Sequence, residues 1–518
     1  MARLDLTKIR FLIIDDFANY RSMLRSILTS CGAQQIEDAR DAKEALQKIT
    51  YNRFDVILCD YNLGDGQNGQ QLLEEIMYRH LIPYGTIYIM ITAENTQSMV
   101  MAAVEYRPDG YLNKPFPKDL LLKRLNMLVE KKSIMKDIYK AYNNKEYLRA
   151  LSIADKKMAL HSKQALDIGK LKGEIALTAG ELDLALQIYD KALTVRDFQW
   201  AKVGKAKVLI KLRELDQAQS LLQEVIAENK NYIEAYDLLA GILEQQGKTK
   251  EVQSVLSSAS SISPNTIARQ QHLAQIAIQN DDFKTAEKSL KRAVTQGKNS
   301  YFGSVNDNMN LVKLYVENGK GKQAVQTLSL AKNIYKKDKA AMLHTQFVES
   351  MIQNKLGNED KARDLFQKAI ANIHGPLAEL PSGLQKDLLT TTEDLGETEL
   401  AEALKDDINN KNIQDNNSIE EMTKKYHYLL QNGKGMRLYN NSRLSEAIDV
   451  FEDAAKNLPE RISVNMNAAQ ALLFYIKTRG KNDTLLLDKA RYFLNVSQKL
   501  DNSNEKYQKL ETIYSELS

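Results

Sequence analysis

The sequence predicts two architectures in one chain: an open α/β domain in about the first 130 residues and an all-α array of helical repeats in the remainder. Three observations predict them. Short apolar runs alternate with amphipathic helical segments at the start of the chain, strand patterns stop near residue 130, and small residues then recur at nearly constant spacing. At 518 residues the chain is also too long for one ordinary core, which favours several domains.

The α/β prediction depends on apolar runs that are long enough for buried strands and too short for helices. Such runs occupy residues 11–14, 56–59 and 87–91, with a shorter one at 110–112. Helical periodicity follows at residues 20–28, 42–49, 72–77 and 99–104. Continuous apolar strands that alternate with amphipathic helices predict a parallel sheet covered on both faces, with right-handed crossover connections.

The residues at the strand ends predict a site. The first run ends in Asp15 and Asp16, the central run in Asp60, and the next in Thr92, while Lys114 follows the short run. The carboxyl ends of parallel strands form the ligand crevice of an open sheet. Each residue alone could be a helix cap, a turn residue or a surface charge. Their occurrence at four strand ends favours one shared site.

The chemistry of this expected site indicates phosphoryl transfer. Three carboxylates at one edge repel one another unless a cation joins them, and Mg²⁺ is the ion usually shared between carboxylates and a phosphoryl group. A lysine opposite the metal would stabilise transfer of a phosphoryl group to a carboxylate. Asp60, which ends the buried run Val56–Cys59, is then the expected nucleophile.

These motifs resemble a known family. Asp15-Asp16, Asp60, Thr92-Ala93-Glu94 and Tyr111-x-x-Lys114-Pro115 match, in order and approximate spacing, the chemotaxis-regulator-like receiver domain of two-component response regulators. The resemblance covers about the first 130 residues and implies a doubly wound, flavodoxin-like, five-stranded parallel sheet. The loop at 63–69 departs from the family by lacking a proline and being one residue longer.

The resemblance also implies residue roles. Asp60 would be the phosphoacceptor, and the Mg²⁺ ligands would be Asp15, Asp16, Asp60 and the Asn62 main-chain carbonyl. Thr92 and Lys114 would contact the phosphoryl oxygens, with Thr92 and Tyr111 as the switch residues. Asn62 and Glu94 would tune dephosphorylation and favour a short-lived mark. The Lys114–Pro115 bond is expected to be cis.

The second part of the chain has an internal repeat. Small residues recur in steps of 33 to 38 residues at Ala150, Ala185, Ala218, Val252, Ala286, Ala324 and Ala362, and the same register returns at Ala447 and Ala490. A glycine twelve residues earlier and an aromatic residue four later accompany two of these positions. The pattern resembles the tetratricopeptide repeat, whose solenoids bind proteins and peptides. A regular Lys/Asn set for binding acidic C-terminal tails is not evident.

The expected domains are the receiver at 1–130, repeats at 131–408 and a C-terminal repeat block at 409–518. Interruptions at 375–383 and 406–418 predict a hinge, with a degenerate repeat between them. The last receiver helix, Pro117–Glu130, continues without proline or glycine, which indicates a stiff coupling to the array. A closing helix is expected at Tyr507–Leu517.

The expected function is that of a bacterial, cytoplasmic response regulator with protein binding as its output. The expected partners are a sensor histidine kinase or histidine phosphotransfer protein, and an unidentified protein on the array; a homodimer is left open. Nucleic-acid binding and membrane insertion are not expected, since the net charge is only +4, the charges are mixed, and no apolar stretch could span a membrane or form a signal peptide.

Two alternatives belong to other functional classes. The chain could be a constitutive scaffold whose receiver serves only docking or dimerisation, which the complete set of acidic, hydroxyl and lysine residues disfavours. An enzyme acting on external phosphate esters would need a second acid two residues after Asp60, where Asn62 stands. Self-phosphorylation and autodephosphorylation at Asp60 are therefore the chemistry expected. Cys31 and Cys59 match neither a disulfide framework nor a zinc site, and Cys59 is expected to be a buried apolar residue.

Overall fold

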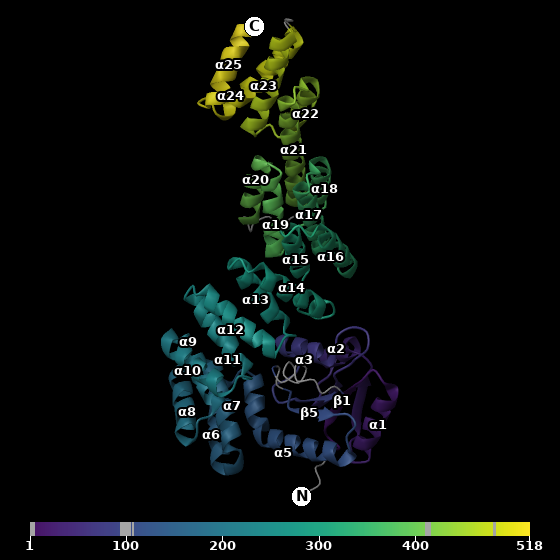
Figure 1. The fold of residues 1–518 in the computed structure, drawn as a ribbon, viewed down its shortest axis with the longest axis vertical. Coiled ribbons are helices and arrows are strands. Elements are labelled where there is room, and N and C mark those ends of the chain that lie inside the picture. Colours follow the sequence, from purple (N-terminus) through teal and green to yellow (C-terminus); the bar gives the residue numbers. More distant parts are fainter. Residues whose placement is uncertain (1–5, 94–104, 106–107, 410–415, 480–482) are drawn as a thin grey trace. The chain divides into compact units, whose positions relative to one another are not determined.

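The computed structural model describes residues 6–93, 105, 108–409, 416–479 and 483–518 (Figure 1). The chain forms two compact units, Met1–Asp307 and Asn308–Ser518. The first contains the α/β domain and the first helical repeats, and the second is helical. The predicted helix at 99–104 lies outside the described residues, as does Glu94.

The α/β domain has one parallel sheet of five strands in the order β2-β1-β3-β4-β5. The strands are β1 (Arg10–Ile14), β2 (Gln35–Ala39), β3 (Val56–Asp60), β4 (Ile87–Thr92) and β5 (Gly110–Asn113). This order confirms the predicted doubly wound, flavodoxin-like fold. The edge strand β2 was not predicted from an apolar run, because only its last residue is buried and its other side chains are not constrained to be apolar.

Helices cover both faces of this sheet (Figure 1). They are α1 (Ala18–Thr29), α2 (Ala42–Tyr51), α3 (Gly69–Tyr78) and α5 (Lys118–Asn143). Alternate residues of each strand point to opposite faces, so Ile57 and Cys59 of β3 pack with α2 and α3, while Val56 and Leu58 pack with α1 and α5. Cys59 is fully buried, as predicted, and burial raises the pKa of its thiol to about 12.

Helix α5 continues from the α/β domain into the repeats without a break. Its inner face buries Leu121, Leu125 and Leu128 against the sheet and Met135 and Ile138 against the first repeat helices. This confirms the continuous helix expected after Pro117. Because one helix contributes to both cores, it is a stiff connection between the two structures.

The repeat helices of the first unit follow as antiparallel pairs. They are α6 (Tyr147–Leu160), α7 (Ala165–Ala179), α8 (Leu182–Val195), α9 (Gln199–Lys211), α10 (Leu215–Glu228), α11 (Ile233–Gln245), α12 (Thr249–Ile262), α13 (Ile267–Gln279) and α14 (Phe283–Gly297). The residues of the predicted repeat register occupy equivalent positions in the structure. Each is the fourth residue of its helix and is fully buried: Ala150, Ala185, Ala218, Val252 and Ala286.

The glycines of the pattern permit close helix approach. A Cβ at Gly173 would lie 2.7 Å from the ring of Tyr189, and one at Gly435 would lie 2.6 Å from the ring of Phe451. Tyr189 and Phe451 are the large residues four places after Ala185 and Ala447. The small and large positions are therefore complementary across the packed helices.

The second unit continues the array from within α15 (Val305–Glu317). Its helices are α16 (Gly321–Ile334), α17 (Lys339–Lys355), α18 (Glu359–Ala371), α19 (Ser382–Asp394), α20 (Thr398–Asn409), α21 (Asn416–Asn440), α22 (Leu444–Asn457), α23 (Ile462–Arg479), α24 (Thr484–Leu500) and α25 (Glu505–Leu517). The pair α19 and α20 is the expected degenerate repeat, and α25 is the expected closing helix. One buried apolar cluster includes residues from Leu343 to Leu510. The boundaries at 130/131 and 408/409 stay predictions.

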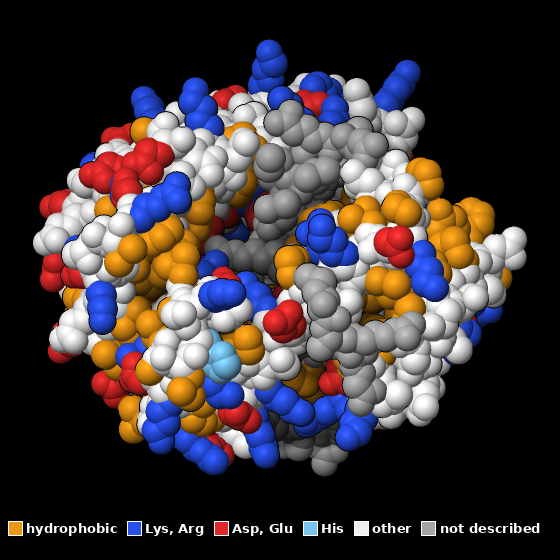
Figure 2. Space-filling model, turned by 90° about the horizontal axis from the view of Figure 1, so that it is seen from below, with side chains coloured by type: hydrophobic (Ala, Val, Ile, Leu, Met, Phe, Trp, Pro, Cys, Tyr) orange, Lys and Arg blue, Asp and Glu red, His pale blue; other side chains and the backbone are white. Residues whose placement is uncertain are grey.

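Two global features bear on function. Among the described residues, none of the helices is long and apolar enough to cross a membrane. Figure 2 shows that side chains of both charge signs are distributed over the visible face of the molecule. A surface of one sign, which nucleic-acid binding needs, is not visible on that face.

Candidate functional site

The candidate site lies at the carboxyl edge of the sheet, where three neighbouring strands end. Register pairs Ile14 of β1 with Cys59 of β3, and Asp60 of β3 with Ile91 of β4. Asp15 therefore emerges on one side of Asp60 and Thr92 on the other. Lys114 follows β5, and the Lys114–Pro115 peptide bond is cis, as predicted.

Three carboxylates converge at this edge. Asp15, Asp16 and Asp60 each contribute one carboxylate oxygen to a group of three oxygens that lie within 4.8 Å of one another. The Oδ1 atom of Asp16 is buried and has no hydrogen-bond donor within the described part of the chain. A buried carboxylate oxygen without a partner is costly. A divalent cation between the three carboxylates would satisfy it, so these residues fit Mg²⁺.

Lys114 is the cation that the structure places in the site. Its Nζ lies 2.8 Å from Asp15 Oδ2 and 2.9 Å from Asp60 Oδ2, and it also lies 4.1 Å from the centroid of the Tyr20 ring. Burial lowers the pKa of Lys114, but its hydrogen bonds to the two carboxylates outweigh burial and raise that pKa overall. The ammonium is therefore held in its charged form next to Asp60.

The environment of Asp60 makes it an unusual carboxyl group. It is 6% exposed, and burial raises its pKa to about 6, although the hydrogen bond from Lys114 acts in the opposite direction. The Tyr61 main-chain N–H donates to Oδ1 at 2.9 Å, which leaves Oδ2 on the side of Lys114 and Asp15. The nucleophile expected from the sequence thus lies within the converging set.

The loop after Asp60 is fixed by its backbone. Gly69 N–H donates to the Tyr61 carbonyl at 2.7 Å, and a Cβ at Gly69 would collide with the Asp60 carbonyl oxygen. Gly64 and Gly66 have φ of 70° and 120°, which favour glycine. Asn62 is an exposed residue of this loop.

The other predicted residues lie on the far side of Asp60 from Asp15. Thr92 ends β4 and is 4% exposed. Tyr111 lies on β5, paired with Met90 of β4, and burial raises its pKa. Its hydroxyl oxygen is buried and has no hydrogen-bond partner among the described residues.

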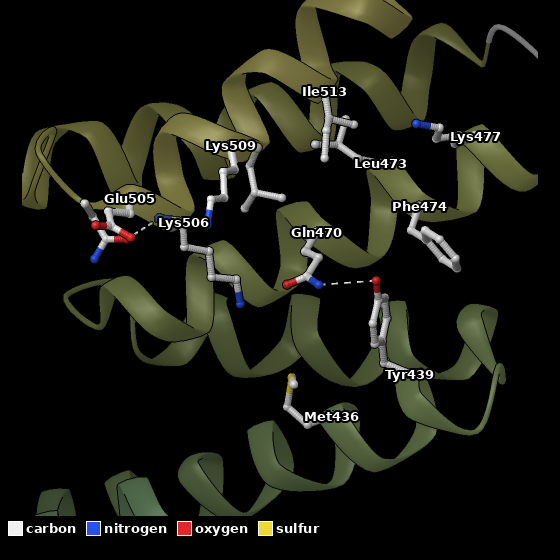
Figure 3. A pocket seen from close by; sticks show the side chains of 12 residues that line it. Met436, Tyr439, Gln470, Leu473, Phe474, Lys477, Glu505, Lys506, Lys509 and Ile513 are labelled. Carbon is white, nitrogen blue, oxygen red and sulfur yellow. Dashed lines mark hydrogen bonds between the residues drawn. The ribbon is translucent and has the colours of Figure 1, made fainter.

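The second unit contains a groove that the sequence did not reveal (Figure 3). It has a volume of about 980 Å³ and lies between α21, α23 and α25. Its lining residues are Met436, Tyr439, Gln470, Leu473, Phe474, Lys477, Asn504, Glu505, Lys506, Lys509, Leu510 and Ile513. Tyr439 and Gln470 are linked by a hydrogen bond of 3.2 Å across the groove (Figure 3).

Beside this groove, three successive first helices contribute one polar chain. Lys506 Nζ donates to Asn467 Oδ1 at 2.6 Å, and Asn467 Nδ2 donates to Asn432 Oδ1 at 3.1 Å. Burial lowers the pKa of Lys506. These residues are 35 and 39 positions apart, so no constant period marks them. Because their spacing is irregular, these lysine and asparagine side chains could not be recognised as a set in the sequence. The stacking of the helices brings them together.

Comparison with known proteins agrees with the fold in both parts of the chain. Residues 11–126 match the family model described as response regulator receiver domain, and residues 176–242 match one described as tetratricopeptide repeat. The chain is 29% identical over 122 residues to chemotaxis protein CheY-3 of Vibrio cholerae, which covers 24% of this chain and 92% of that protein. It is 26% identical over 122 residues to chemotaxis protein CheY of Pseudomonas aeruginosa, covering 24% and 97%.

Solved structures are similar to the same part of the chain. A CheY-like receiver domain protein from Methanospirillum hungatei is 28% identical, with 24% of this chain and 96% of that chain covered and a TM-score of 0.22. Chemotaxis protein CheY4 of Vibrio cholerae is 29% identical, with 23% and 98% covered and a TM-score of 0.22. The family models thus show a response regulator receiver domain in the N-terminal part of the chain, followed by a tetratricopeptide-repeat region.

Proposed function

We propose that this protein is a response regulator that accepts a phosphoryl group on Asp60 and thereby changes protein–protein interactions made by its repeat array. A sensor histidine kinase or a histidine phosphotransfer protein supplies the phosphoryl group. The observation that supports the proposal most strongly is the convergence of Asp15, Asp16 and Asp60 with the Lys114 ammonium at one sheet edge.

The side chains at the carboxyl edge of the sheet have distinct roles in the proposed phosphoryl transfer. A carboxylate oxygen of Asp60 forms the bond to phosphorus while the bond from phosphorus to the donor's imidazole nitrogen breaks. Lys114 and the Thr92 hydroxyl stabilise the phosphoryl oxygens, and the Lys114 contact to Asp60 is already formed. Asp15, Asp16, Asp60 and the Asn62 carbonyl would hold Mg²⁺, which neutralises charge during transfer.

Thr92 and Tyr111 are the side chains that would change position when Asp60 is phosphorylated. The added group brings nearly two negative charges to a site whose only ammonium, among the described residues, is that of Lys114. Thr92 can turn toward the new oxygens, and Tyr111, whose hydroxyl has no partner in the described residues, can take up a second position. Such a two-state arrangement lets a local charge change alter a distant surface.

The output surface that we favour is the groove between α21, α23 and α25. Its floor includes Leu473, Phe474 and Ile513, and Phe474 is 44% exposed. Lys506 and Lys509 extend from α25 over this floor, while Lys477 lies at the other end (Figure 3). Apolar side chains beside three lysines fit a peptide segment of a partner protein that carries both acidic and apolar residues.

The proposal places the protein in the bacterial cytoplasm, where its phosphodonor would act, with self-phosphorylation and autodephosphorylation at Asp60 as its chemistry. The direct test is incubation of the full chain with a small phosphodonor and Mg²⁺, followed by intact mass measurement. We expect one phosphoryl adduct on the unaltered chain and none on Asp60→Asn. Asp65→Asn, an exposed carboxylate of the same loop, is the matched control and should label normally. A stable adduct on Asp60→Asn would refute the assignment.

The constitutive scaffold makes a different prediction in the same system. A scaffold whose receiver serves only docking would bind its partner equally with and without beryllofluoride and Mg²⁺. A switch requires a difference in affinity between these two conditions, because a ligand shifts an equilibrium only through differential binding.

A further inference from the structure

The junction between α12 and α13 contains a buried polar cluster that the receiver chemistry does not use. It consists of Arg269 on α13 and the hydroxyls of Ser263 and Thr266 just before that helix. Ser263 is fully buried, Thr266 is 5% exposed, and the Arg269 side chain is 2% exposed. A buried guanidinium and two buried hydroxyls converging at one point are the donors that a carboxylate needs.

A carboxylate occupies this cluster, and it comes from the receiver. Ser263 Oγ and Thr266 Oγ1 each donate a hydrogen bond of 2.8 Å to Glu105 Oε2. Arg269 forms an ion pair with Glu105 through Nη2. The two partners are separated by 164 residues in the chain, and Glu105 belongs to the segment between β4 and β5, in the receiver domain that holds Asp60.

A second acidic residue, Asp237, orients the Arg269 guanidinium for this ligand. Arg269 Nε and Nη2 donate to Asp237 on α11 at 2.8 and 2.7 Å. Burial lowers the pKa of Arg269, but the hydrogen bonds and charges of Asp237 and Glu105 raise it overall. The Asp237 side chain is 44% exposed, whereas that of Glu105 is 14% exposed. Asp237 orients the guanidinium from the solvent side, and Glu105 contacts it on the buried side.

A second set of contacts joins the receiver to the C-terminal end of α14 and the residues that follow it. The Gln71 side chain of α3 donates to the Gln296 carbonyl at 2.8 Å, and Asn299 donates to the Gly66 carbonyl at 2.9 Å. The ring of Tyr78 lies 5.1 Å from that of Phe302. Gly66 belongs to the loop that follows Asp60, so this loop is hydrogen-bonded directly to the array.

We propose that the α12–α13 junction is a carboxylate-binding site of the array, and that Glu105 of the receiver is its resident ligand in the unphosphorylated chain. The receiver is thereby docked on the repeat formed by α13 and α14 and keeps acidic groups of other proteins out of this site. The site itself is independent of phosphorylation, whereas its regulation rests on the proposed function.

The coupling has a physical basis in the β3–α3 loop. The contacts at Gly66 and Gln71 belong to the arrangement in which Lys114 is paired with Asp15 and Asp60. Gly66 lies on the loop that follows Asp60, so a rearrangement of this loop on phosphorylation would weaken the contacts of Gly66 and Gln71 to the array. We therefore expect phosphorylation of Asp60 to loosen both sets of contacts between the receiver and the α13–α14 repeat.

Hydrogen–deuterium exchange of the full chain tests the site without phosphate. We expect Glu105→Gln to raise the exchange rate of residues 263–271 by about tenfold, because a buried charge-assisted contact is lost. Glu130→Gln, an exposed residue on α5, is the matched control and should leave these rates unchanged. Rates in Glu105→Gln that equal those of the unaltered chain would overturn the proposed site.

A double-mutant cycle separates a specific contact from general loosening. Ser263→Ala and Thr266→Val together should raise exchange less in a Glu105→Gln background than in the unaltered chain, since the shared interaction is already absent. Strictly additive effects would count against a direct contact. These measurements need no phosphodonor, so their failure is distinct from a failure to phosphorylate Asp60.

A separate exchange measurement tests whether phosphorylation of Asp60 regulates the carboxylate-binding site. Beryllofluoride with Mg²⁺ should raise exchange at residues 263–271 and 296–302 in the unaltered chain and have no further effect at 263–271 in Glu105→Gln. Unchanged exchange in a chain that demonstrably labels on Asp60 would refute the regulation of the site while leaving the phosphoacceptor assignment intact.

Discussion

At the scale of single residues, we expect the Asn62 side chain to influence the lifetime of the proposed phosphoryl group on Asp60. Asn62 is exposed on the loop two residues after Asp60, where an attacking water would approach a phosphoryl group. A small amide leaves room for that water and can hydrogen-bond it. We predict that Asn62→Arg lengthens the phosphate lifetime several-fold. Phosphate release from the labelled full chain measures it, and Asp65→Asn is the control. A lifetime of hours in the unaltered chain with Mg²⁺ would contradict a transient mark.

Asp307 is a buried acid whose ionisation opposes folding. Burial raises its pKa to about 6, although Gln271 Nε2 donates to its Oδ2 at 2.7 Å. A folded-state pKa above the ordinary value of 3.8 means that the native state binds the proton more tightly. The resulting stabilisation is complete below about pH 3.8 and is lost as the pH rises through about 6.

Asp307→Asn tests this pH dependence. Asparagine keeps an oxygen for Gln271 and carries no charge, so the variant should be more stable than the unaltered chain at pH 8, by about 3 kcal/mol. The difference should shrink when the pH is lowered from 8 to 5. Scanning calorimetry of the full chain at both pH values measures it. A constant difference would show that the carboxyl group does not titrate in this range.

At the scale of the helix pair, the repeat depends on glycines that admit an aromatic ring. Gly204 of α9 packs against Tyr189 of α8 so closely that an added Cβ would overlap a ring carbon. We predict that Gly204→Ala destabilises the first unit by about 1–3 kcal/mol through overpacking. Gly241 of α11 has no atom within 4 Å of an added Cβ. Gly241→Ala should therefore stabilise the unit by up to about 1 kcal/mol through helix propensity. Equal shifts in melting temperature for the two variants would contradict this account.

At the scale of the whole molecule, the proposed input and output sites lie in different structures. The carboxylates that would receive the signal lie at a sheet edge in the first unit, and the lysine-rimmed groove lies between α21, α23 and α25 in the second. We predict that Lys509→Glu weakens binding of an acidic, apolar peptide about tenfold or more, because it replaces an attraction by a repulsion. Lys499→Glu on α24, which does not line the groove, should bind normally. Titration with a fluorescent peptide measures both, and equal weakening would contradict a role for the groove.

The sequence by itself determined the fold classes, the carboxyl-edge cluster and the repeat register. Each follows from a local pattern: apolar runs fix Asp15, Asp60 and Thr92 at strand ends, and a near-constant spacing fixes the buried alanines. Only the tertiary structure decided which residues meet across repeats and domains. Glu105 reaches Arg269 because the receiver packs against the repeats, and Lys506 reaches Asn467 because the repeat helices stack. No local period encodes either contact. The edge strand β2 is also a feature that only the tertiary structure decided. Its exposed side chains carry no strand pattern, and pairing with β1 alone places it in the sheet.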